Sequence, residues 1–313
     1  MKIVYMGTPD FAVAPLKKIA EAGYDIAAVF TQPDREKGRG KKVAFSDVKT
    51  AAIELGLEDK IYQPEKLRDE EYVKILKNIA PDLIVVAAYG QILSQEILDI
   101  PKYGCVNIHA SLLPKYRGAS PIEASIMNGD EKTGITIMYM AKGLDTGDII
   151  TAGDMPIEVY DTTESLTEKL SQLGAELIVN VIPALENGTA SRTPQTEEDS
   201  CYAGKLDKEM GRLDYTRPAA ELERLIRAMY PWPCAFTELG GKSLKILGAK
   251  VDESFEDKGE APGTVINVTK KLITVKCGEA ALTITKLQPE GKKPMDTVAF
   301  LNGYKVSVGE HFG

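Results

Sequence analysis

Histidine, tryptophan and cysteine are scarce in this chain of 313 residues, which has two, one and four of them. The four cysteines are widely spaced, so the sequence has no C-x-x-C pair and no zinc-ribbon spacing. We therefore expect no metal site. Widely spaced cysteines of this kind are typical of reduced, mostly structural thiols, and they predict a cytoplasmic protein.

Long apolar runs are also absent. No stretch approaches the ~20 residues that a membrane helix requires. The first residues, MKIVYMGTPDF, turn polar after a short apolar burst, which is typical of a first strand and not of a secretion signal. A composition of 43% hydrophobic and 27% charged residues is that of a globular protein. We expect a protein without a membrane partner, and a monomer as the default.

Positive charge is limited as well, since the net charge is −8. This balance argues against indiscriminate nucleic-acid binding, but the charge is unevenly distributed. From residue 206 onward, 16 Lys and Arg face 15 Asp and Glu, whereas the first 205 residues carry 22 against 31. The acidic character therefore belongs to the first two thirds of the chain.

Short apolar runs alternate with helical patterns in the first half of the chain. Continuous Val, Ile and Ala runs flanked by amphipathic segments predict a Rossmann-like, doubly wound α/β domain with a mostly parallel sheet. A long helix is expected over 161–188, with Asp161 and Glu164 in capping-box spacing and a stop at Gly188. The predicted strands are 2–6, 25–31, 82–88, 105–109, 133–140 and 147–159.

The last third of the chain has a different texture. After a helix expected over 218–231, short alternating strands are separated by Gly-rich turns, which predicts a small, OB-like β-barrel. The polar segment between the two parts has no apolar periodicity. We therefore predict a catalytic domain over 1–188, a linker over 189–205 and a C-terminal barrel over 206–313. The PWP stretch is expected to be structural, packing Trp232 where the domains meet.

Two familiar motifs are missing. The turn after the first strand has Gly7 but no G-x-G-x-x-G fingerprint, which disfavours a dinucleotide-dependent oxidoreductase. There is no G-x-S-x-G, and no other nucleophile is evident. Covalent catalysis is therefore not expected.

One of the two histidines stands in a chemically informative place. In the predicted strand 105–109, Asn107 and His109 are two residues apart, so both side chains point to one face. Asp145 lies on a Gly-bounded loop, GLDTGD, after another predicted strand. A carboxylate can fix the tautomer of a neighbouring histidine. An amide, an imidazole and a carboxylate suit direct transfer of a carbonyl group to an external nucleophile, with Asn107 and His109 stabilising the oxyanion.

At this point the sequence resembles the folate-dependent formyltransferases, whose hallmark is Asn-x-His with a later Asp. The resemblance rests on MGTPDFAV, AAYGQIL, NIHASLLPKYRGASPI and GITIMYMAKGLDTGDII, in that order. Within the family, TQPDREKGRGKK, MYPWPCAF and the all-β C-terminal part are similar to the members that act on methionyl-tRNA. These features extend over essentially the whole chain.

The resemblance implies transfer of a formyl group from 10-formyltetrahydrofolate, as co-substrate, to the α-amine of initiator methionyl-tRNA. It implies catalytic roles for Asn107, His109 and Asp145. It also implies a folate site in two loops, formed by Ser111, Leu112, Leu113 and Pro114 together with Tyr89, Gly90, Gln91 and Ile92.

A basic loop, DREKGRGKK, follows the second predicted strand and carries a net charge of +3. Such a run is often a solvated surface, but phosphates of an acceptor stem would also suit it. The resemblance implies that it contacts tRNA, with lysines of the barrel such as Lys286, Lys292 and Lys293 extending the phosphate-binding surface. The candidate residues in the loop are Arg35, Lys37, Arg39, Lys41 and Lys42.

Other functions stay open at this level. The same chemistry could serve a small amine, such as a purine-pathway ribonucleotide or an amino-sugar nucleotide, or water in a hydrolase. The basic loop and the barrel count against a small acceptor, which needs neither. A non-catalytic RNA-binding protein is disfavoured because binding alone would not require Asn107, His109 and Asp145.

Overall fold

The computed structural model describes residues 1–37, 42–256 and 258–313. The chain forms two compact units. The first comprises Met1–Pro121, Lys132–Pro156 and Thr167–Ala203, and the second comprises Ile122–Glu131, Ile157–Leu166 and Gly204–Gly313. The domain boundaries expected at 188 and 205 stay predictions. Of the helices that the structure describes, none combines the length and apolarity of a membrane span.

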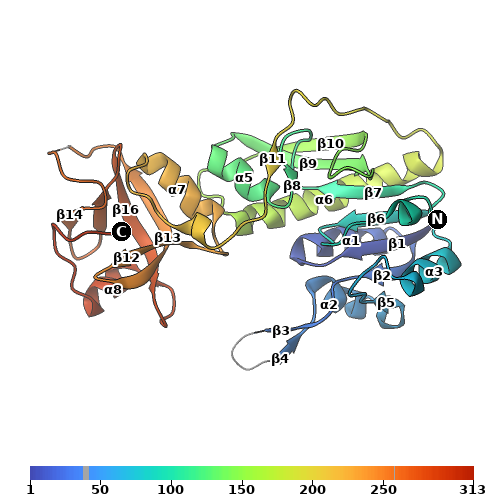
Figure 1. The fold of residues 1–313 in the computed structure, drawn as a ribbon, viewed down its shortest axis with the longest axis horizontal. Coiled ribbons are helices and arrows are strands. Elements are labelled where there is room, and N and C mark those ends of the chain that lie inside the picture. The colour runs from blue at the N-terminus through green and yellow to red at the C-terminus, as the bar shows by residue number, and fades with distance from the viewer. Residues whose placement is uncertain (38–41, 257) are drawn as a thin grey trace. The chain divides into compact units, whose positions relative to one another are not determined.

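The first unit is built on a seven-stranded sheet with the order β10-β9-β7-β6-β1-β2-β5 (Figure 1). The strands from β7 to β5 in this order pair in parallel, whereas β9 and β10 are antiparallel. The strands are β1 (Lys2–Gly7), β2 (Asp25–Phe30), β5 (Ile61–Tyr62), β6 (Leu83–Ala87), β7 (Cys105–His109), β9 (Lys132–Tyr139) and β10 (Ile149–Pro156).

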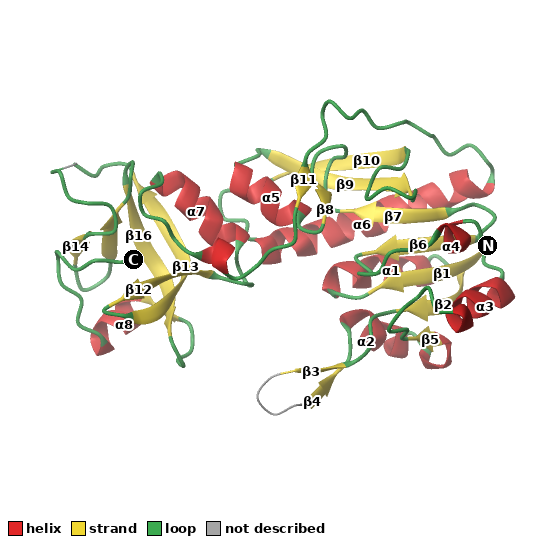
Figure 2. Cartoon of the chain, in the orientation of Figure 1, coloured by secondary structure: helices red, strands yellow, loops and turns green. Residues whose placement is uncertain are grey.

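Helices cover both faces of this sheet (Figure 2). On one face, Val73 and Leu76 of α3 share a hydrophobic core with Val4 and Met6 of β1. On the other, α6 comes so close to β7 that a Cβ at Gly174 would lie 2.8 Å from Ile108 Cγ2. The doubly wound fold is confirmed. The helices of the first unit are α1 (Val13–Glu21), α2 (Asp47–Glu54), α3 (Glu70–Ile79), α4 (Gln95–Leu98) and most of α6 (Thr163–Glu186), with short 3₁₀ helices η1 (Asp10–Ala12) and η2 (Glu58–Lys60).

The start of α6 differs by one residue from the expected capping box. Ser165 N donates to Thr162 Oγ1 at 3.3 Å, and Thr162 N donates to Ser165 Oγ at 3.1 Å. Asp161 instead accepts from the Ser165 hydroxyl and from Glu158 N. Because the helix begins after Thr162, the reciprocal pair is Thr162 and Ser165 and not Asp161 and Glu164. The stop at Gly188 is confirmed by its φ of +69°.

Two small sheets have no apolar signature in the sequence. In the basic loop, β3 (Arg35–Lys37) and β4 (Lys42–Ala44) form an antiparallel pair that extends from the first unit (Figure 1). Further along, β8 (Arg117–Gly118) pairs in parallel with β11 (Tyr202–Ala203). Much of the segment expected as a linker, residues 189–203, therefore belongs to the first unit, because its backbone bonds to the loop after β7.

The second unit contains a six-stranded antiparallel sheet with the order β12-β13-β16-β15-β14, and β17 pairs with β16. Bridges from Leu239 to Phe312 and from Thr264 to His311 connect the two outer strands, β12 and β14, through residues 311–312. The predicted small barrel is confirmed. The strands are β12 (Ala235–Leu239), β13 (Lys242–Asp252), β14 (Val265–Val268), β15 (Ile273–Lys276), β16 (Ala281–Pro289) and β17 (Met295–Asp296).

Helices complete this unit. The buried side of α7 (Ala219–Ala228), which includes Leu222 and Ile226, shares the barrel core with Leu282 and Phe300. Trp232, just after α7, is 54% exposed, and the expectation that it packs where the domains meet stays a prediction. The other helices here are α5 (Pro121–Asn128), α8 (Thr297–Gly303) and the 3₁₀ helix η3 (Glu209–Gly211).

Phe312 closes the barrel, and we expect its side chain to contribute to the stability of the second unit. Its side chain is fully buried against Tyr215, with ring centroids 6.3 Å apart, and its N–H donates to Gly263 O. Replacing Phe312 with Ala should lower the free energy of unfolding of the second unit by ~3–5 kcal/mol. Urea unfolding followed by fluorescence of Trp232, the single tryptophan, measures this. Val308→Ala, at a 64% exposed position, is the control, and equal unfolding midpoints for the two variants would contradict the prediction.

Candidate active site

The carboxyl ends of β1, β2 and β6 are tied together at one edge of the sheet. Thr8 Oγ1 and Gln32 Nε2 both donate to the carbonyl of Tyr89, at 3.0 and 3.1 Å. The chain can turn there because Ala88 and Gly90 both have positive φ, +44° and +85°. Ligands of open α/β sheets bind at this edge, so the loop 88–92 stands where a ligand is expected.

His109 ends β7 at the same edge. Its side chain is almost fully buried, and Nε2 lies 2.9 Å from the carbonyl of Tyr116. A carbonyl only accepts, so Nε2 carries a proton and donates it. The other ring nitrogen, Nδ1, lies 3.7 Å from Asp145 Oδ2. The atom available for chemistry is therefore Nδ1, beside a carboxylate.

Asp145 joins three segments. Its Oδ2 accepts from the backbone N–H of Gly118 at 2.8 Å, and its Oδ1 accepts from Asn107 Nδ2 at 3.5 Å, which is a long contact. Asp145 itself has a φ of +51°, unusual for a residue other than glycine. The structure thus brings together the three residues that the sequence singled out, Asn107, His109 and Asp145.

Gly118 has to be glycine. Its φ is +117°, and a Cβ there would collide with the carbonyl of Ala203 and lie 2.7 Å from Cε2 of Tyr202. The close approach comes from the pairing of β8 with β11. The N–H of Gly118, which donates to Asp145, is therefore held where two backbone segments approach so closely that a side chain on residue 118 would not fit.

The loop 111–114 is fixed from within the sheet. Thr136 Oγ1, on β9, accepts from Leu113 N at 3.0 Å and donates to Ser111 O at 2.7 Å. Ser111 is fully buried, and its hydroxyl donates to Lys115 O. Leu113 is also buried, whereas Leu112 and Pro114 are partly exposed. Of the four residues expected to contact folate here, Leu112 and Pro114 present side-chain surface.

The four residues expected in the other folate loop have different surroundings. Gln91 spans the 64–67 turn, donating to Pro64 O and accepting from Leu67 N. Ile92 is 87% exposed. Tyr89 is buried, its hydroxyl has no partner among the described residues, and burial raises its pKa above the usual value. Gly90, next to it, is exposed.

Thiol and metal chemistry find no support in the described part of the chain. Burial raises the pKa of Cys105, on β7, to about 12, so this thiol stays protonated at neutral pH. Cys201 is exposed, and its sulfur accepts from Tyr116 N at 3.2 Å. Residues 1–37, 42–256 and 258–313 contain no cluster of His, Cys, Asp and Glu suited to a metal ion.

The basic hairpin is anchored at its base. Lys49 and Gln63 both donate to the carboxylate of Asp34, just before β3. Burial of Asp34 opposes ionisation, but these hydrogen bonds outweigh it and hold the pKa of Asp34 below its usual value. Arg35 is exposed at the start of β3, and Lys37 and Lys42 are register partners. Arg39 and Lys41 lie outside the described residues.

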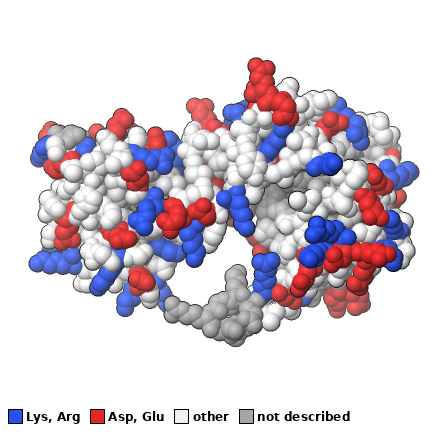
Figure 3. Space-filling model, in the orientation of Figure 1, with Lys and Arg blue, Asp and Glu red and all other residues white. Residues whose placement is uncertain are grey.

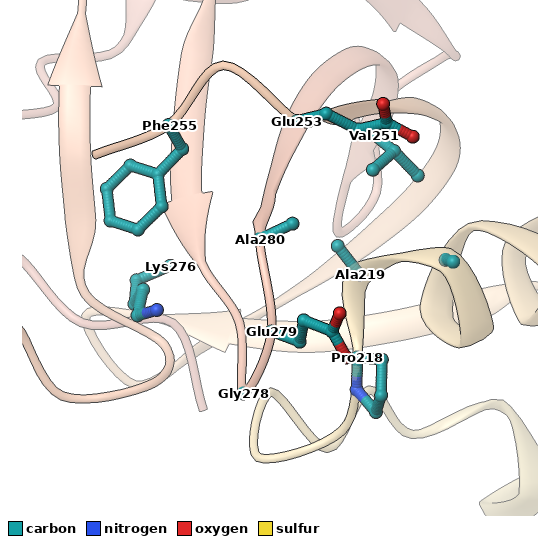
Figure 4. A pocket seen from close by; sticks show the side chains of 10 residues that line it. Pro218, Ala219, Val251, Glu253, Phe255, Lys276, Gly278, Glu279 and Ala280 are labelled. Atoms are coloured by element: carbon teal, nitrogen blue, oxygen red, sulfur yellow. The ribbon is translucent and has the colours of Figure 1, made fainter. Parts of the chain in front are cut away.

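The barrel presents charge of both signs. Lys286, Lys292 and Lys293 are exposed, and Figure 3 shows basic side chains interspersed with acidic ones on the visible face of the second unit. A pocket of about 500 Å³ lies in this unit, and its lining includes Lys276, Phe255, Glu253 and Glu279 (Figure 4). Its ten lining residues include neither histidine nor a side-chain amide, so the donor set described above is not duplicated there.

Several residues that build the site have no signal in the sequence. The carbonyl of Tyr116 and the N–H of Gly118 are backbone groups, which any residue type supplies. Gln195 lies in the segment expected as a linker, yet its Nε2 donates to the carbonyls of Asp145 and Gly147, at 2.9 and 2.8 Å. Only the paired folding of distant segments makes these groups part of the site.

Two protein families match this chain. Residues 1–182 match the family described as "Formyl transferase", and residues 205–305 match "Formyl transferase, C-terminal domain". The first match alone covers more than half of the chain. This chain belongs to the formyl transferase family.

Similar formyl transferases are found among curated bacterial proteins. The methionyl-tRNA formyltransferase of Agathobacter rectalis is 46% identical over 312 residues, covering 100% of this chain and 99% of the relative. That of Caldanaerobacter subterraneus subsp. tengcongensis is 47% identical over 310 residues, covering 99% of each. The chain is thus an enzyme that transfers a one-carbon group.

Solved structures share the formyl transferase fold. HypX from Aquifex aeolicus, in complex with tetrahydrofolic acid, matches with a TM-score of 0.66 at 16% identity, covering 99% of this chain. The match covers 50% of HypX, so this chain spans about half of its length. An N-formyltransferase from Helicobacter canadensis, in complex with folinic acid and dTDP-3-aminofucose, matches at 0.66 and 19% identity, covering 91% and 98% of the two chains.

Proposed function

We propose that this enzyme transfers the formyl group of 10-formyltetrahydrofolate to the α-amine of initiator methionyl-tRNA, at the start of translation. The observation that carries the proposal is the cluster of Asn107, His109 and Asp145 at the carboxyl edge of the sheet. The relatives that are 46–47% identical over nearly their whole length are named methionyl-tRNA formyltransferases, which supports the choice of acceptor.

The loops at this edge fit a folate. A reduced pterin offers ring faces for apolar contact and several donors and acceptors on its edge, so its site needs apolar surface together with backbone hydrogen bonds. Ile92, Leu112 and Pro114 present apolar surface on two loops of the first unit, and Tyr89 contributes a buried hydroxyl that lacks a partner among the described residues. Of the expected contacts, Ser111 would act by holding its loop, since its hydroxyl is already bonded to Lys115.

The donors of the site determine how the reaction would be assisted. 10-Formyltetrahydrofolate supplies the formyl group on N10, and that nitrogen leaves with the proton that the amine loses. As the neutral α-amine attacks the formyl carbon, negative charge gathers on the formyl oxygen. The side-chain N–H of Asn107 and Nδ1–H of protonated His109 would both donate to this oxygen. Nε2–H of His109, bonded to Tyr116 O, would keep the ring in place.

Asp145 would accept the proton that the attacking amine loses and return it to the leaving nitrogen. Its Oδ2 is held by Gly118 N, while Oδ1 has a long contact with Asn107. Oδ1 would therefore accept the proton of the attacking nitrogen, directly or through a water, and return it to the leaving nitrogen. No covalent enzyme intermediate is required, in agreement with the protonated state of Cys105.

The basic hairpin is the proposed tRNA contact. Its net charge of +3 stands in a region of 22 basic and 31 acidic residues, so phosphates would find local attraction there. The hairpin follows β2. Gln32 lies between the two, and its side chain donates to the carbonyl of Tyr89 in the loop 88–92 of the candidate site. Arg35, Lys37, Arg39, Lys41 and Lys42 stay the proposed contacts, and Lys286, Lys292 and Lys293 of the barrel would extend them.

A formyl-transfer assay with several acceptors tests the proposed function. Charged initiator tRNA, charged elongator tRNA and an amino-sugar nucleotide are offered side by side with 10-formyltetrahydrofolate. We expect the initiator to be formylated with the highest kcat/KM. A higher kcat/KM for the amino-sugar nucleotide would assign the same chemistry to a small acceptor and overturn the proposal.

The oxyanion role predicts the effect of two substitutions. His109→Ala and Asn107→Ala should each lower kcat by about 10²-fold or more, as the loss of an oxyanion donor does. Binding of the folate, measured by isothermal titration, should change little, because both side chains act on the reacting oxygen. Near-complete turnover in either variant would show that the assigned mechanism is wrong.

Charge removal in the hairpin should affect the acceptor alone. Arg39→Gln should raise KM for the tRNA and reduce the dependence of kcat/KM on salt concentration, since fewer counterions are released on binding. KM for the folate should stay the same. The matched control is Lys102→Gln, an exposed cation elsewhere on the first unit. An equal rise in both KM values for Arg39→Gln would place the hairpin at the folate site instead.

A further inference from the structure

We propose that Gln195 is a positioning residue that holds the loop of Asp145 in its catalytic conformation, with Arg117 fixing the orientation of the Gln195 amide. The inference deepens the proposed function, on which it rests, because it concerns the same site. Gln195 lies in a polar segment that shows no apolar periodicity. The structure places its side chain in contact with the loop that carries Asp145.

The amide of Gln195 uses both of its protons on this loop. Nε2 donates to the carbonyl of Asp145 at 2.9 Å and to the carbonyl of Gly147 at 2.8 Å. The two acceptors are two residues apart, so a single side chain spans the turn. Gly147 cannot be replaced by a residue with a side chain, because a Cβ there would collide with the carbonyl of Tyr139.

Arg117 determines which way the amide faces. Its Nε donates to Gln195 Oε1 at 3.1 Å, and its Nη1 donates to both carboxylate oxygens of Glu197, at 2.9 and 3.0 Å. A guanidinium only donates and carbonyls only accept. The oxygen of Gln195 must therefore face Arg117, and its NH₂ must face the two carbonyls. Arg117 is only 8% exposed, so its hydrogen bonds face little competition from solvent.

The Asp145 loop needs such a partner. Asp145 has a φ of +51°, in the left-handed region that is unfavourable for most residues other than glycine. Its neighbour Leu144 is 57% exposed and Thr146 is exposed, so burial of side chains does little to hold the turn. Hydrogen bonds to the backbone on both sides of the turn offset this cost. They also keep the carboxylate where Gly118 N, Asn107 and His109 meet it.

The segment that carries Gln195 is itself fixed to the same part of the sheet. Ile149 and Thr193 exchange two backbone hydrogen bonds, at 2.8 and 3.0 Å. Beyond Gln195, β11 pairs with β8 and thereby places Ala203 against Gly118. Gln195 is thus held between two backbone pairings, which gives its amide a defined position relative to Asp145.

Two substitutions separate donation from packing. Gln195→Leu keeps the approximate size and removes both functions of the amide, whereas Gln195→Glu keeps the oxygen that Arg117 needs and removes the NH₂. Both variants should lower kcat by between about 10-fold and 100-fold, because a displaced catalytic group costs this much, with KM for both substrates nearly unchanged. The matched control is Thr196→Val, because the hydroxyl of Thr196 donates to the exposed side chain of Asp199. Wild-type kcat in Gln195→Glu would overturn the proposal, since packing alone would then suffice.

A double-mutant cycle tests whether Gln195 acts through Asp145. In an Asp145→Asn background the carboxylate is already lost, so adding Gln195→Leu should change kcat less than twofold. A full additional loss would mean that Gln195 acts on something else, and would overturn the proposal. All variants are compared with the wild-type enzyme on the acceptor that gives wild type its highest rate. A wild-type enzyme inactive on methionyl-tRNA would refute the proposed function without affecting these ratios.

Hydrogen exchange provides a readout that needs no substrate. The N–H of Gly118 donates to Asp145 Oδ2, so its exchange reports whether the carboxylate is in place. By NMR of the labelled full chain, Gly118 should exchange at least about tenfold faster in Gln195→Leu and Gln195→Glu than in the wild type or Thr196→Val. Unchanged exchange in both Gln195 variants would show that the loop does not depend on this amide.

Discussion

The carboxylate of Asp145 is the constraint on which the rest of the site depends. It is the point where β7, the turn at β8 and the loop after β9 meet, through Asn107, Gly118 and His109. A buried carboxylate is costly unless donors surround it, and a buried N–H without an acceptor is costly as well. The two costs offset each other only when the three segments are in register. The same contact therefore couples the correctness of the fold to the presence of a working site.

The central strand of the site could be predicted from the sequence because it follows from local rules. Alternation of side chains put Asn107 and His109 on one face, and the short segment CVNIH, set between helical patterns, predicted a strand of the mostly parallel sheet. Asp145 could be named because a Gly-bounded turn followed a strand. By contrast, the partner of His109 Nε2 is the carbonyl of Tyr116, and a backbone carbonyl carries no residue signature.

Residues 189–203 show why the remainder could not be predicted. Hydrophobic periodicity reports burial of apolar surface, and this segment is held mainly by polar bonds, such as those of Thr193, Gln195 and Cys201. The pair of β3 and β4 was not predicted for the same reason, because most of its residues are charged. Ser111 illustrates a different limit: its hydroxyl donates to Lys115 O within its own loop, a bond that no residue pattern predicts, while the folate contact implied by the resemblance stays a prediction. The helix α3 has apolar residues at helical spacing, Val73 and Leu76, and could have been predicted.

The second unit is assembled from pieces that are far apart along the chain. Arg224 Nε donates to Met127 O, Arg227 Nη1 donates to Asp161 O, and the Thr163 hydroxyl donates to Ala228 O. Residues 122–131 and 157–166 are thus translated well before the barrel strands with which they are grouped. On the ribosome, the sheet of the first unit can form while these two segments still wait for α7 to emerge. Synthesis from one end to the other therefore gives this enzyme an interval in which the strand that carries Asn107 and His109 has been made and the partners of Met127, Asp161 and Thr163 in α7 have not.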